Sequence, residues 1–262
     1  MKIFIVIVLY RTKLEHSISY ISLKYEISRQ ALSEQIQLII WDNSPEFNPV
    51  QCYHHSGNNI GLTKIYNAMF DEYIERPDSF LMVSDQDTNY KGIDFGSLLG
   101  LLGAQNNKEV GVFVPKLYSN GKMVSPGKRF GFIGRRTNNV VSGLTASKNF
   151  LAINSGLILN YNCRKVLGKL FDENLQFYGS DTEFFVRYQN YFKYVYVLPY
   201  QFSHGLSDDE KVTYSQHSYR TKEKFSSLLY IFRHQPLIYI YAPYFFIKAY
   251  FRFALTLLRK GS

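Results

Sequence analysis

The sequence predicts an α/β protein in which a mixed, mostly parallel sheet is flanked by helices and followed by a C-terminal helical tail. Apolar runs of strand length alternate with segments of helical periodicity over the first 210 residues, which is typical of parallel strands joined by helices. Hydrophobic residues make up 46% of the 262 residues and charged residues 19%, so the chain can bury a core and is not disordered. We therefore expect one domain over residues 1–210 and a tail over residues 211–262.

Six apolar runs are interpreted as strands, and the turn residues after them mark their ends. The first run is apolar throughout, as expected for a strand that is buried on both faces of a parallel sheet. Asp42–Pro45 is a turn signal after the second run, and Pro115 stops the fourth. The predicted strands are Lys2–Tyr10, Ile36–Trp41, Phe80–Ser84, Val110–Val114, Phe150–Leu159 and Tyr194–Pro199.

Helices are predicted between these runs. Ile65, Met69 and Tyr73 recur at the spacing of one helix face. The stretch Lys116–Gly143 has no clear periodicity. Its basic segment Gly127–Arg136 could meet an anionic acceptor or form a solvated loop, and we favour the loop. The predicted helices are Leu14–Leu32, Leu62–Ile74, Ser180–Asn190 and a tail helix within Leu237–Leu258.

The formal net charge of +9 is concentrated at the C-terminal end. Residues 1–210 carry 21 basic and 20 acidic residues, whereas residues 211–262 carry nine basic residues and one acid, Glu223. A nucleic-acid-binding protein more often carries its charge on the domain that reads the nucleic acid, so we expect no such partner. The aromatic and basic residues of Leu237–Leu258 instead predict a helix lying on an anionic membrane surface. A helix that packs on the body or mediates dimerisation is the alternative.

The cysteines and the apolar stretches bear on the cellular compartment of the protein. Cys52 and Cys163 are far apart, which excludes a disulfide framework and a zinc ribbon and predicts a reducing cytoplasm. No stretch reads as a cleavable signal, and Pro243 and Lys248 interrupt Leu237–Leu258, so no membrane-spanning helix is expected. We expect a cytoplasmic protein that is peripheral at the inner face of the cell membrane.

Acidic residues follow two of the predicted strands. In open α/β sheets ligands bind at the carboxyl ends of the strands, so Asp42, Asp85 and Asp87 should lie along one edge of a cleft. Asp85 and Asp87, spaced at i and i+2, can both reach a divalent cation as hard oxygen ligands, which favours Mg²⁺ or Mn²⁺. A solvated turn is the alternative interpretation of this motif.

Two later residues could complete such a site. Asp181 begins the predicted helix Ser180–Asn190 and can act as a helix cap or as a general base that takes a proton from an attacking hydroxyl. His204 follows the strand Tyr194–Pro199 and is either a structural histidine or a third metal ligand.

Taken in order, these motifs resemble glycosyltransferase family 2 over roughly Lys2–Ser207. The Asp85-Gln86-Asp87 form, with Phe171–Glu173 and Asp181–Glu183, is most similar to the bacterial rhamnosyltransferases. The resemblance implies a GT-A fold with a nucleotide-binding half at about residues 1–115 and an acceptor half at about 116–210. The matching pieces are Ile5–Tyr10, Trp41–Ser44, Asn58–Gly61, Tyr66–Ala68, Asp85–Asp87, Asn154–Gly156, Gly179–Glu183 with Arg187, and His204-Gly205.

The resemblance also implies a role for each matched residue. Asp181 is implied as the catalytic base, and Asp87 and His204 as metal ligands. The chemistry of a leaving diphosphate adds Arg220 of the tail as a cation for the nucleotide sugar. The residues implied for the nucleotide sugar are Tyr10, Arg11, Asp42, Asn59, Gly61, Asn67 and Asp85. Those implied for the acceptor or the sugar are Asn154, Ser155, Gly156 and Glu183.

The expected activity is an inverting, metal-dependent sugar transfer, since one carboxylate base is typical of direct displacement. We expect dTDP-rhamnose as the donor and a lipid-linked saccharide of a bacterial surface polysaccharide as the acceptor. Two other classes stay open. A nucleotidyltransferase that makes sugar nucleotides would favour a Gly-rich loop after the first strand, where Tyr10–Lys13 has no glycine. In a non-catalytic membrane-associated binding module, the acids would be surface turns.

Overall fold

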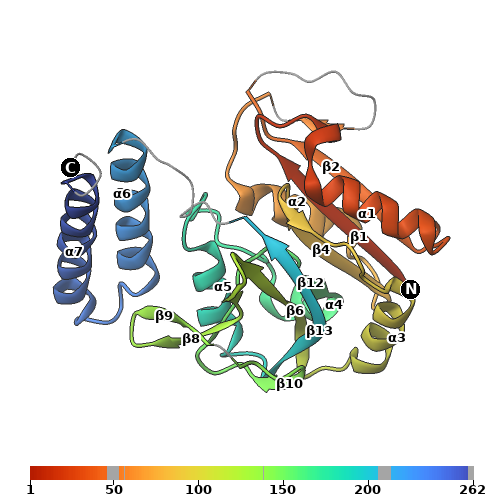
Figure 1. Ribbon diagram of the computed structural model, residues 1–262. Helices are drawn as coiled ribbons and strands as arrows, with labels where there is room; N and C mark the ends of the chain where they lie inside the picture. The colour runs from red at the N-terminus through yellow and green to blue at the C-terminus, as the bar shows by residue number, and fades with distance from the viewer. Residues whose placement is uncertain (46–52, 56, 138, 206–213, 259–262) are drawn as a thin grey trace. The chain divides into compact units, whose positions relative to one another are not determined.

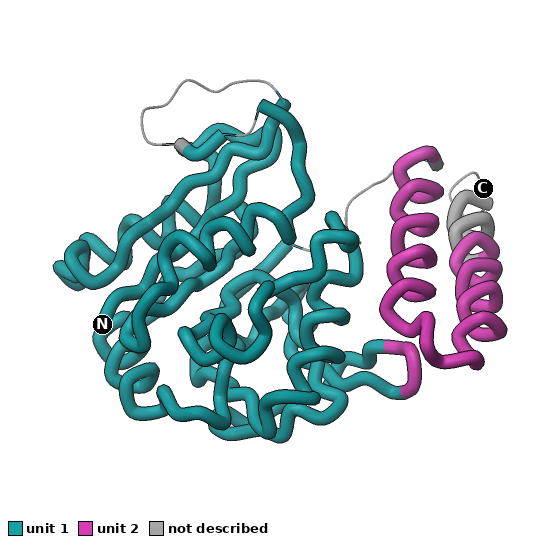
Figure 2. The backbone as a smooth tube through the Cα atoms, turned by 180° about the vertical axis from the view of Figure 1, so that it is seen from behind, with its two compact units in different colours: residues 1–130, 134–206 teal, residues 131–133, 207–262 magenta. Residues whose placement is uncertain are grey.

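The computed structural model describes residues 1–45, 53–55, 57–137, 139–205 and 214–258, in two compact units (Figure 2). The first unit comprises residues 1–130 and 134–206, and the second comprises residues 131–133 and 207–262. The expected boundary between residues 210 and 211 lies outside the described residues.

A ten-stranded mixed sheet forms the centre of the first unit (Figure 1). Its strand order is β10-β13-β6-β12-β4-β1-β2-β3, with β5 paired to β13 and β7 paired to β6. Strands β4, β1, β2 and β3 are parallel, whereas β12 is antiparallel to both neighbours. The predicted α/β class with a mixed, mostly parallel sheet is confirmed. The strands are β1 Lys2–Leu9, β2 Ile36–Asp42, β3 Tyr53–His55, β4 Ser79–Asp85, β5 Thr88–Asn89, β6 Val110–Ser119, β7 Lys122–Ser125, β10 Gly143–Ala146, β12 Ile158–Asn160 and β13 Tyr194–His204.

Helices cover both faces of this sheet. Along β1, Ile5 and Ile7 pack into a core with helices α1 and α3, while Val6 and Val8 pack into a second core with α2, α4 and α5. Alternate residues of a strand point to opposite faces, so the apolar run of β1 supplies both cores. The helices are α1 Ile18–Arg29, α2 Leu62–Tyr73, α3 Phe95–Gln105, α4 Tyr161–Leu167 and α5 Ser180–Tyr188, with the short 3-10 helix η1 at Leu14–His16.

Strand register brings the expected acidic ends to one edge of the sheet. In β1, Leu9 lies opposite Asp42 of β2, and Val8 lies opposite Asp85 of β4. Both acids therefore end their strands at the same level on either side of β1. The edge predicted from the sequence is confirmed.

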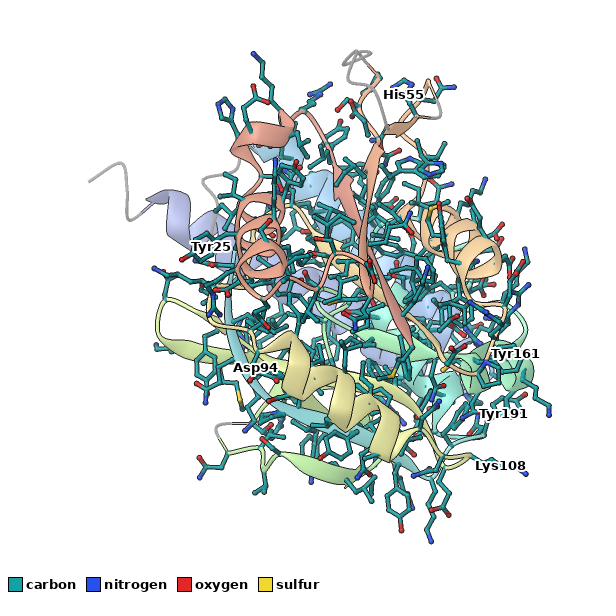
Figure 3. All side chains as sticks on the ribbon, turned by 90° about the vertical axis from the view of Figure 1, so that its right-hand side faces the viewer. Tyr25, His55, Asp94, Lys108, Tyr161 and Tyr191 are labelled. Carbon is teal, nitrogen blue, oxygen red and sulfur yellow. The ribbon has the colours of Figure 1, made fainter. Side chains whose placement is uncertain are left out.

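Helix α3 was not expected from the sequence. Its residues include Gly96, Gly100 and Gly103, and glycine lowers helix propensity by about 1 kcal/mol per position relative to alanine. Tertiary burial and a cap offset this cost: Leu98 and Leu102 are fully buried, and the Asp94 carboxylate accepts a hydrogen bond from the Ser97 amide at 2.9 Å (Figure 3).

One strand prediction and one loop prediction were wrong. Phe150–Leu159 is not one strand, because β11 (Phe150–Leu151) pairs with β8 whereas β12 belongs to the main sheet, and Gly156 turns between them with φ +80°. The stretch Gly127–Arg136 is not a loop. It forms β8 (Gly127–Phe130) and β9 (Ile133–Arg136), which with β11 make a small three-stranded sheet. These strands are too short and too exposed to show an alternating pattern.

Prolines proved weaker strand breakers than expected. Strand β6 continues past Pro115, and β13 continues past Pro199 to His204. Both prolines lie where the β6–β13 pairing shifts register, between the Val114–Val197 and Lys116–Gln201 pairs. A missing proline N–H is tolerated at such an irregularity. The extension of β13 carries His204 to the sheet edge.

The second unit contains helices α6 (Tyr214–Ile231) and α7 (Ile238–Leu258). The inner side of α7 packs against α6, with the Phe225 and Phe246 rings 5.0 Å apart and a hydrogen bond of 2.8 Å between Ser218 and Tyr250. Within this unit Phe132 also packs on Phe232, at 5.1 Å between ring centroids. Among the described residues, none of the helices combines the length and apolarity needed to cross a membrane.

Candidate active site

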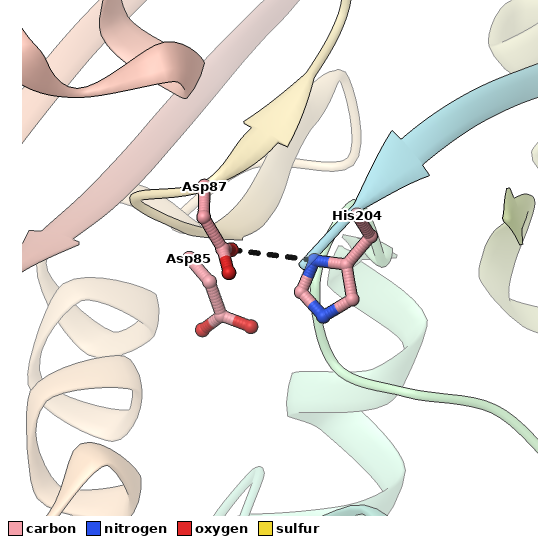
Figure 4. Close-up of side chains that lie close together, drawn as sticks. All are labelled: Asp85, Asp87 and His204. Carbon is pink, nitrogen blue, oxygen red and sulfur yellow. Dashed lines mark ion pairs between the residues drawn. The ribbon is translucent and has the colours of Figure 1, made fainter. Parts of the chain in front are cut away.

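Asp85, Asp87 and His204 form a compact cluster at the edge of the sheet (Figure 4). One donor atom from each residue lies within 4.8 Å of the others. The His204 Nδ1 atom is 3.4 Å from a carboxylate oxygen of Asp87, and the histidine is 8% exposed. Two acids and a histidine from distant parts of the chain therefore share one small volume, as the sequence analysis expected.

Thr88 fixes the histidine. Strand β5 pairs with β13 so that Thr88 lies opposite His204, and the Thr88 hydroxyl is 2.8 Å from Nδ1. The same hydroxyl is 2.7 Å from the Ser155 hydroxyl, which accepts a hydrogen bond from the Asp85 amide at 3.0 Å. A chain of buried hydrogen bonds thus links the backbone of Asp85 to the ring of His204.

The start of helix α1 supports the loop that carries the two acids. The Ser19 hydroxyl donates to the carbonyl of Asp85 and accepts from the amide of Thr88 at 2.9 Å. Ser17, the N-cap of α1, donates its hydroxyl to the carbonyl of Gln86 at 3.0 Å. These bonds satisfy backbone groups of a buried turn that sheet pairing leaves open. The loop is therefore held from the helix side as well as from the strand side.

Gly205 allows the closest approach within the cluster. A Cβ atom at this position would lie 2.5 Å from Oδ2 of Asp87, a separation that real Cβ atoms essentially never show. Glycine therefore fits directly after His204. Contact with the Asp87 carboxylate supplies a physical reason for it.

Burial raises the pKa of Asp85 to about 6, and the charges of Asp87 and Asp181 add to the rise. The charge of His204 and a long hydrogen bond from the Tyr66 hydroxyl, at 3.5 Å, act in the opposite direction. The cluster therefore holds negative charge that the protein alone does not fully balance.

These residues fit a divalent cation. Carboxylate oxygens and imidazole nitrogen are ligands that Mg²⁺ or Mn²⁺ accept, and ligands about 2.1 Å from one ion lie at most about 4.2 Å apart. The 4.8 Å spread of the donor atoms is within reach of that limit after small side-chain rotations. If Nδ1 of His204 carries the proton toward Thr88, Nε2 keeps its lone pair for the metal. Asp85, Asp87 and His204 are thus a suitable ligand set.

A second group of predicted residues surrounds the end of β2. Asp42 is buried, and one of its carboxylate oxygens accepts a hydrogen bond from the Ser44 amide, while the other has no hydrogen-bond partner within the described residues. Arg11, in left-handed backbone with φ +51°, donates its amide to the Ser44 hydroxyl, and the Tyr10 amide donates to Gln86 at 2.9 Å. Gln86 thus ties this group to the Asp85–Asp87 loop.

Asn59, Gly61 and Asn67 hold neighbouring segments together. Asn59 accepts a hydrogen bond from Asn43. Gly61, the N-cap of α2, lies so close to Gln176 that a Cβ atom on Gly61 would be 3.0 Å from that residue. The Asn67 amide exchanges hydrogen bonds with the backbone of Phe171 at 2.8 and 2.9 Å. These contacts give the three residues supporting roles, and their contact with a nucleotide sugar stays a prediction.

The residues expected to bind acceptor or sugar are largely engaged with the protein. Ser155 belongs to the Thr88 hydrogen-bond chain, and Asn154 donates to the Ser180 hydroxyl at 3.1 Å. Gly156 lies so close to Pro115 that a Cβ atom on Gly156 would be 2.7 Å from the proline ring. Glu183 forms an ion pair of 2.8 Å with Arg187. Most of their polar groups are therefore bonded within the protein, whereas the buried Oδ1 atom of Asn154 has no hydrogen-bond partner within the described residues.

Asp181 lies in the first turn of α5, where its carboxylate accepts a hydrogen bond from the Thr182 amide at 2.7 Å. Its charge contributes to the raised pKa of Asp85, so the two carboxylates are within electrostatic reach of each other. Arg220 lies in α6, in the second unit, and its assignment to the diphosphate stays a prediction.

Several supporting residues were not predicted from the sequence. Ser19 and Thr88 are buried hydroxyls whose partners are distant in sequence, and no local pattern marks them. Gly205 did carry a signal, since it is part of the matched pair His204-Gly205.

Comparison with solved structures shows the fold. The chain is similar to GalNAc-T7 in a crystal structure with UDP, GalNAc and Mn²⁺ (TM-score 0.60, 9% identity, 88% of this chain and 47% of that chain). It is similar to S. aureus TarS, with a TM-score of 0.55 and 14% identity over 87% of this chain and 40% of that chain. It is also similar to the mannosyltransferase PcManGT of Pyrobaculum calidifontis, solved with GDP-Man and Mn²⁺, with a TM-score of 0.54 and 8% identity over 98% of this chain and 75% of that chain. The chain spans less than half the length of the first two. No protein-family model and no curated protein sequence matches it. The fold is GT-A, as expected.

We predict that replacing Asp87 with alanine lowers Mn²⁺ affinity at least tenfold, because one of three donor groups is lost. Isothermal titration with Mn²⁺ measures this directly. The matched control is Glu34→Ala, since Glu34 is exposed and precedes β2, away from the carboxyl edge. Equal Mn²⁺ affinity in the Asp87 variant and the control would contradict the ligand assignment.

Mn²⁺ affinity should also depend on pH. A metal ligand must be deprotonated, and the pKa of Asp85 is raised to about 6, so below that pH the ion has to displace a proton. We expect similar affinity at pH 7 and pH 8 and a loss of roughly tenfold per unit below about pH 6. The affinity is measured by titration at four pH values. An unchanged affinity between pH 5 and pH 7 would rule out Asp85 as a ligand.

Proposed function

We propose that the protein is a metal-dependent glycosyltransferase that moves a sugar from a nucleoside diphosphate sugar to an acceptor hydroxyl with inversion. The observation that carries this proposal is the Asp85–Asp87–His204 cluster at the carboxyl edge of a GT-A sheet, with the Asp181 carboxylate within electrostatic reach. Two structures of the same fold hold a nucleotide and Mn²⁺, which supports the kind of donor and cation.

The cluster would hold the cation that neutralises the leaving diphosphate. Asp85 and Asp87 supply oxygen ligands, and the Thr88 hydrogen bond keeps the His204 ring oriented toward them. Asp42 ends β2 and Arg11 follows the end of β1, and the edge around them would receive the nucleoside. The donor is thereby held along the carboxyl ends of β1, β2 and β4.

Asp181 would act as the general base. As the acceptor oxygen bonds to the anomeric carbon, the bond from that carbon to the diphosphate oxygen breaks, and the hydroxyl proton passes to the Asp181 carboxylate. Attack and departure occur on opposite faces of the sugar, so a single displacement inverts the anomeric configuration. The hydrogen bond from Thr182 orients the carboxylate for this role.

For the finer identity we infer a bacterial rhamnosyltransferase that uses dTDP-rhamnose and a lipid-linked saccharide of a surface polysaccharide. The support is the Asp85-Gln86-Asp87 form together with Phe171–Glu173 and Asp181–Glu183. A nucleotidyltransferase would instead release pyrophosphate from a nucleoside triphosphate, and a binding module would release no product. Assays of nucleoside diphosphate release from a panel of nucleotide sugars separate the three.

The tail suits a membrane-bound acceptor. The outer side of α7 exposes apolar and aromatic residues at helical spacing, and Lys248 lies 5.6 Å from the Tyr244 ring among them. Aromatic rings with flanking cations favour the headgroup region of a membrane. We infer that the protein docks peripherally on an anionic membrane face through this side of α7. The exposed residues are Leu237, Ile240, Tyr241, Tyr244, Ile247 and Phe251.

The Asp181→Asn variant should lose about 10²- to 10⁴-fold in turnover while donor binding is retained, because the amide keeps the shape but cannot take the proton. Asp94→Asn is the matched control, since it makes the same change at the start of α3 and asparagine can still cap the helix. Product formation and nucleotide affinity are measured on both variants. If the Asp181→Asn variant kept wild-type turnover, Asp181 would not be the base and would only be part of the first turn of α5.

Membrane docking predicts that the full chain sediments with anionic vesicles, more weakly with neutral ones, and less at high salt. Each basic residue near an anionic surface contributes about 1 kcal/mol, which salt screens. Ile247→Asp should reduce the bound fraction strongly, whereas Ile21→Asp on the exposed side of α1 should not. Absence of the wild type from both pellets would refute docking and favour a packing or dimerisation role.

A further inference from the structure

A small cavity opens beside Asp181 in the first unit. Its volume is about 180 Å³, below the ~300–1,000 Å³ of sites for drug-sized ligands, so it suits one substituent or one sugar unit. Asp181 and Thr182 of α5 form one wall, and the strands β8 and β9 supply another; Figure 1 shows where α5, β8 and β9 lie in the fold. The other lining residues are Val124 and Ser125 of β7 and the segment Leu151–Ile153, which leads into Asn154 and Ser155.

The charge of the lining is dominated by two arginines. Arg135 and Arg136 line the cavity, and Asp181 is the one acid among its lining residues. Within the described part of the chain, neither arginine forms an ion pair with a carboxylate, whereas Arg187 and Arg29 do. The lining therefore has an excess of positive charge.

Strand geometry assigns the leading role to Arg136. A Cβ at Gly134 would lie 3.0 Å from the Leu151 side chain, so this face of β9 points to the Leu151 wall. Residues two apart in a strand share a face, which places Arg136 on the same side. Arg135 is on the alternate face, where its guanidinium lies 5.3 Å from the Phe130 ring.

The base of the hairpin is well anchored to the first unit. Strand β8 pairs with β11, with Leu151 opposite Gly127 and Phe150 opposite Lys128. Arg129 adds hydrogen bonds from its amide and guanidinium to Asn149, at 2.7 and 2.9 Å. The cavity wall is thus built by paired strands.

We propose that this cavity binds an anionic group of the acceptor, a phosphate or a carboxylate close to the hydroxyl that is glycosylated. Arg136 makes the contact, because Arg135 points to the other face of β9. The inference rests on the proposed function, because it takes Asp181 as the base that faces the acceptor hydroxyl. A guanidinium can donate two parallel hydrogen bonds to either anion, which fixes both position and orientation. The Arg136 cation also offsets the repulsion between such an anion and the Asp181 carboxylate.

The test uses three small probes: methyl glucuronide as the carboxylate, glucose 6-phosphate as the phosphate, and methyl glucoside as the neutral analogue. NMR titration of the full chain should give saturable binding of at least one anionic probe and at least tenfold weaker binding of methyl glucoside. Arg136→Ala should weaken the anionic probe at least tenfold, and Arg136→Lys should restore part of the loss. Lys128→Ala is the matched control, since Lys128 is an exposed cation of the same hairpin that does not line the cavity.

The outcomes are distinct. Tighter binding of glucuronide would identify an acidic sugar as the source of the anion, and tighter binding of glucose 6-phosphate would identify a phosphate. Equal binding by wild type and Arg136→Ala, with Mn²⁺ affinity intact as a check of folding, would overturn the proposal, as would equal binding of the neutral probe. If the anions bind through Arg136 but no nucleotide sugar is consumed, the proposed transferase function fails and with it the acceptor assignment, while the anion site stands.

Discussion

The candidate site depends on one buried hydroxyl, that of Thr88. It is in hydrogen-bond contact with His204 on one side and Ser155 on the other, while the backbone of Thr88 is bonded to Ser19 of α1. Three elements far apart in sequence therefore meet at this residue. A buried polar network is stable only when each of its groups has a hydrogen-bond partner. Here each of the three hydroxyls, those of Thr88, Ser155 and Ser19, has one. The positions of Asp85 and His204 relative to each other follow from it.

The short separation between Asp85 and Asp87 has an energetic cost, which a proton or a bound cation can reduce. Asp85 and Asp87 lie near each other at a partly buried edge, and burial together with the neighbouring carboxylates raises the pKa of Asp85. Sites that hold such unfavourable charge are more often functional than structural. A divalent cation would offset both carboxylates at once. The charge arrangement and the donor geometry thus lead independently to the same kind of ligand.

The sequence was sufficient for the parts of the site that belong to continuous apolar strands. Asp42 and Asp85 could be placed at one edge because β2 and β4 read as buried strands with polar ends. His204 was harder, because β13 runs past a proline and pairs with β5, a strand of two residues. Arg135 and Arg136 were misread as a solvated loop, because β9 is four exposed residues long and its partner is recognised only in three dimensions. Local pattern therefore predicts strand ends, whereas partners held by long-range pairing require the structure.

The two sides of the site differ in burial. Buried residues form the side around Thr88, and an exposed hairpin forms the side beyond Asp181. The metal side rests on buried, mutually bonded residues such as Thr88 and Ser155, so a change there disturbs the fold as well as the ligands. The side beyond Asp181 is a hairpin in which Arg135 and Arg136 are exposed. Substitutions of exposed residues usually change stability by less than about 0.5 kcal/mol. A substitution in the hairpin can therefore change the charge beside Asp181 while the hydrogen bonds of Thr88 and Ser155 stay intact.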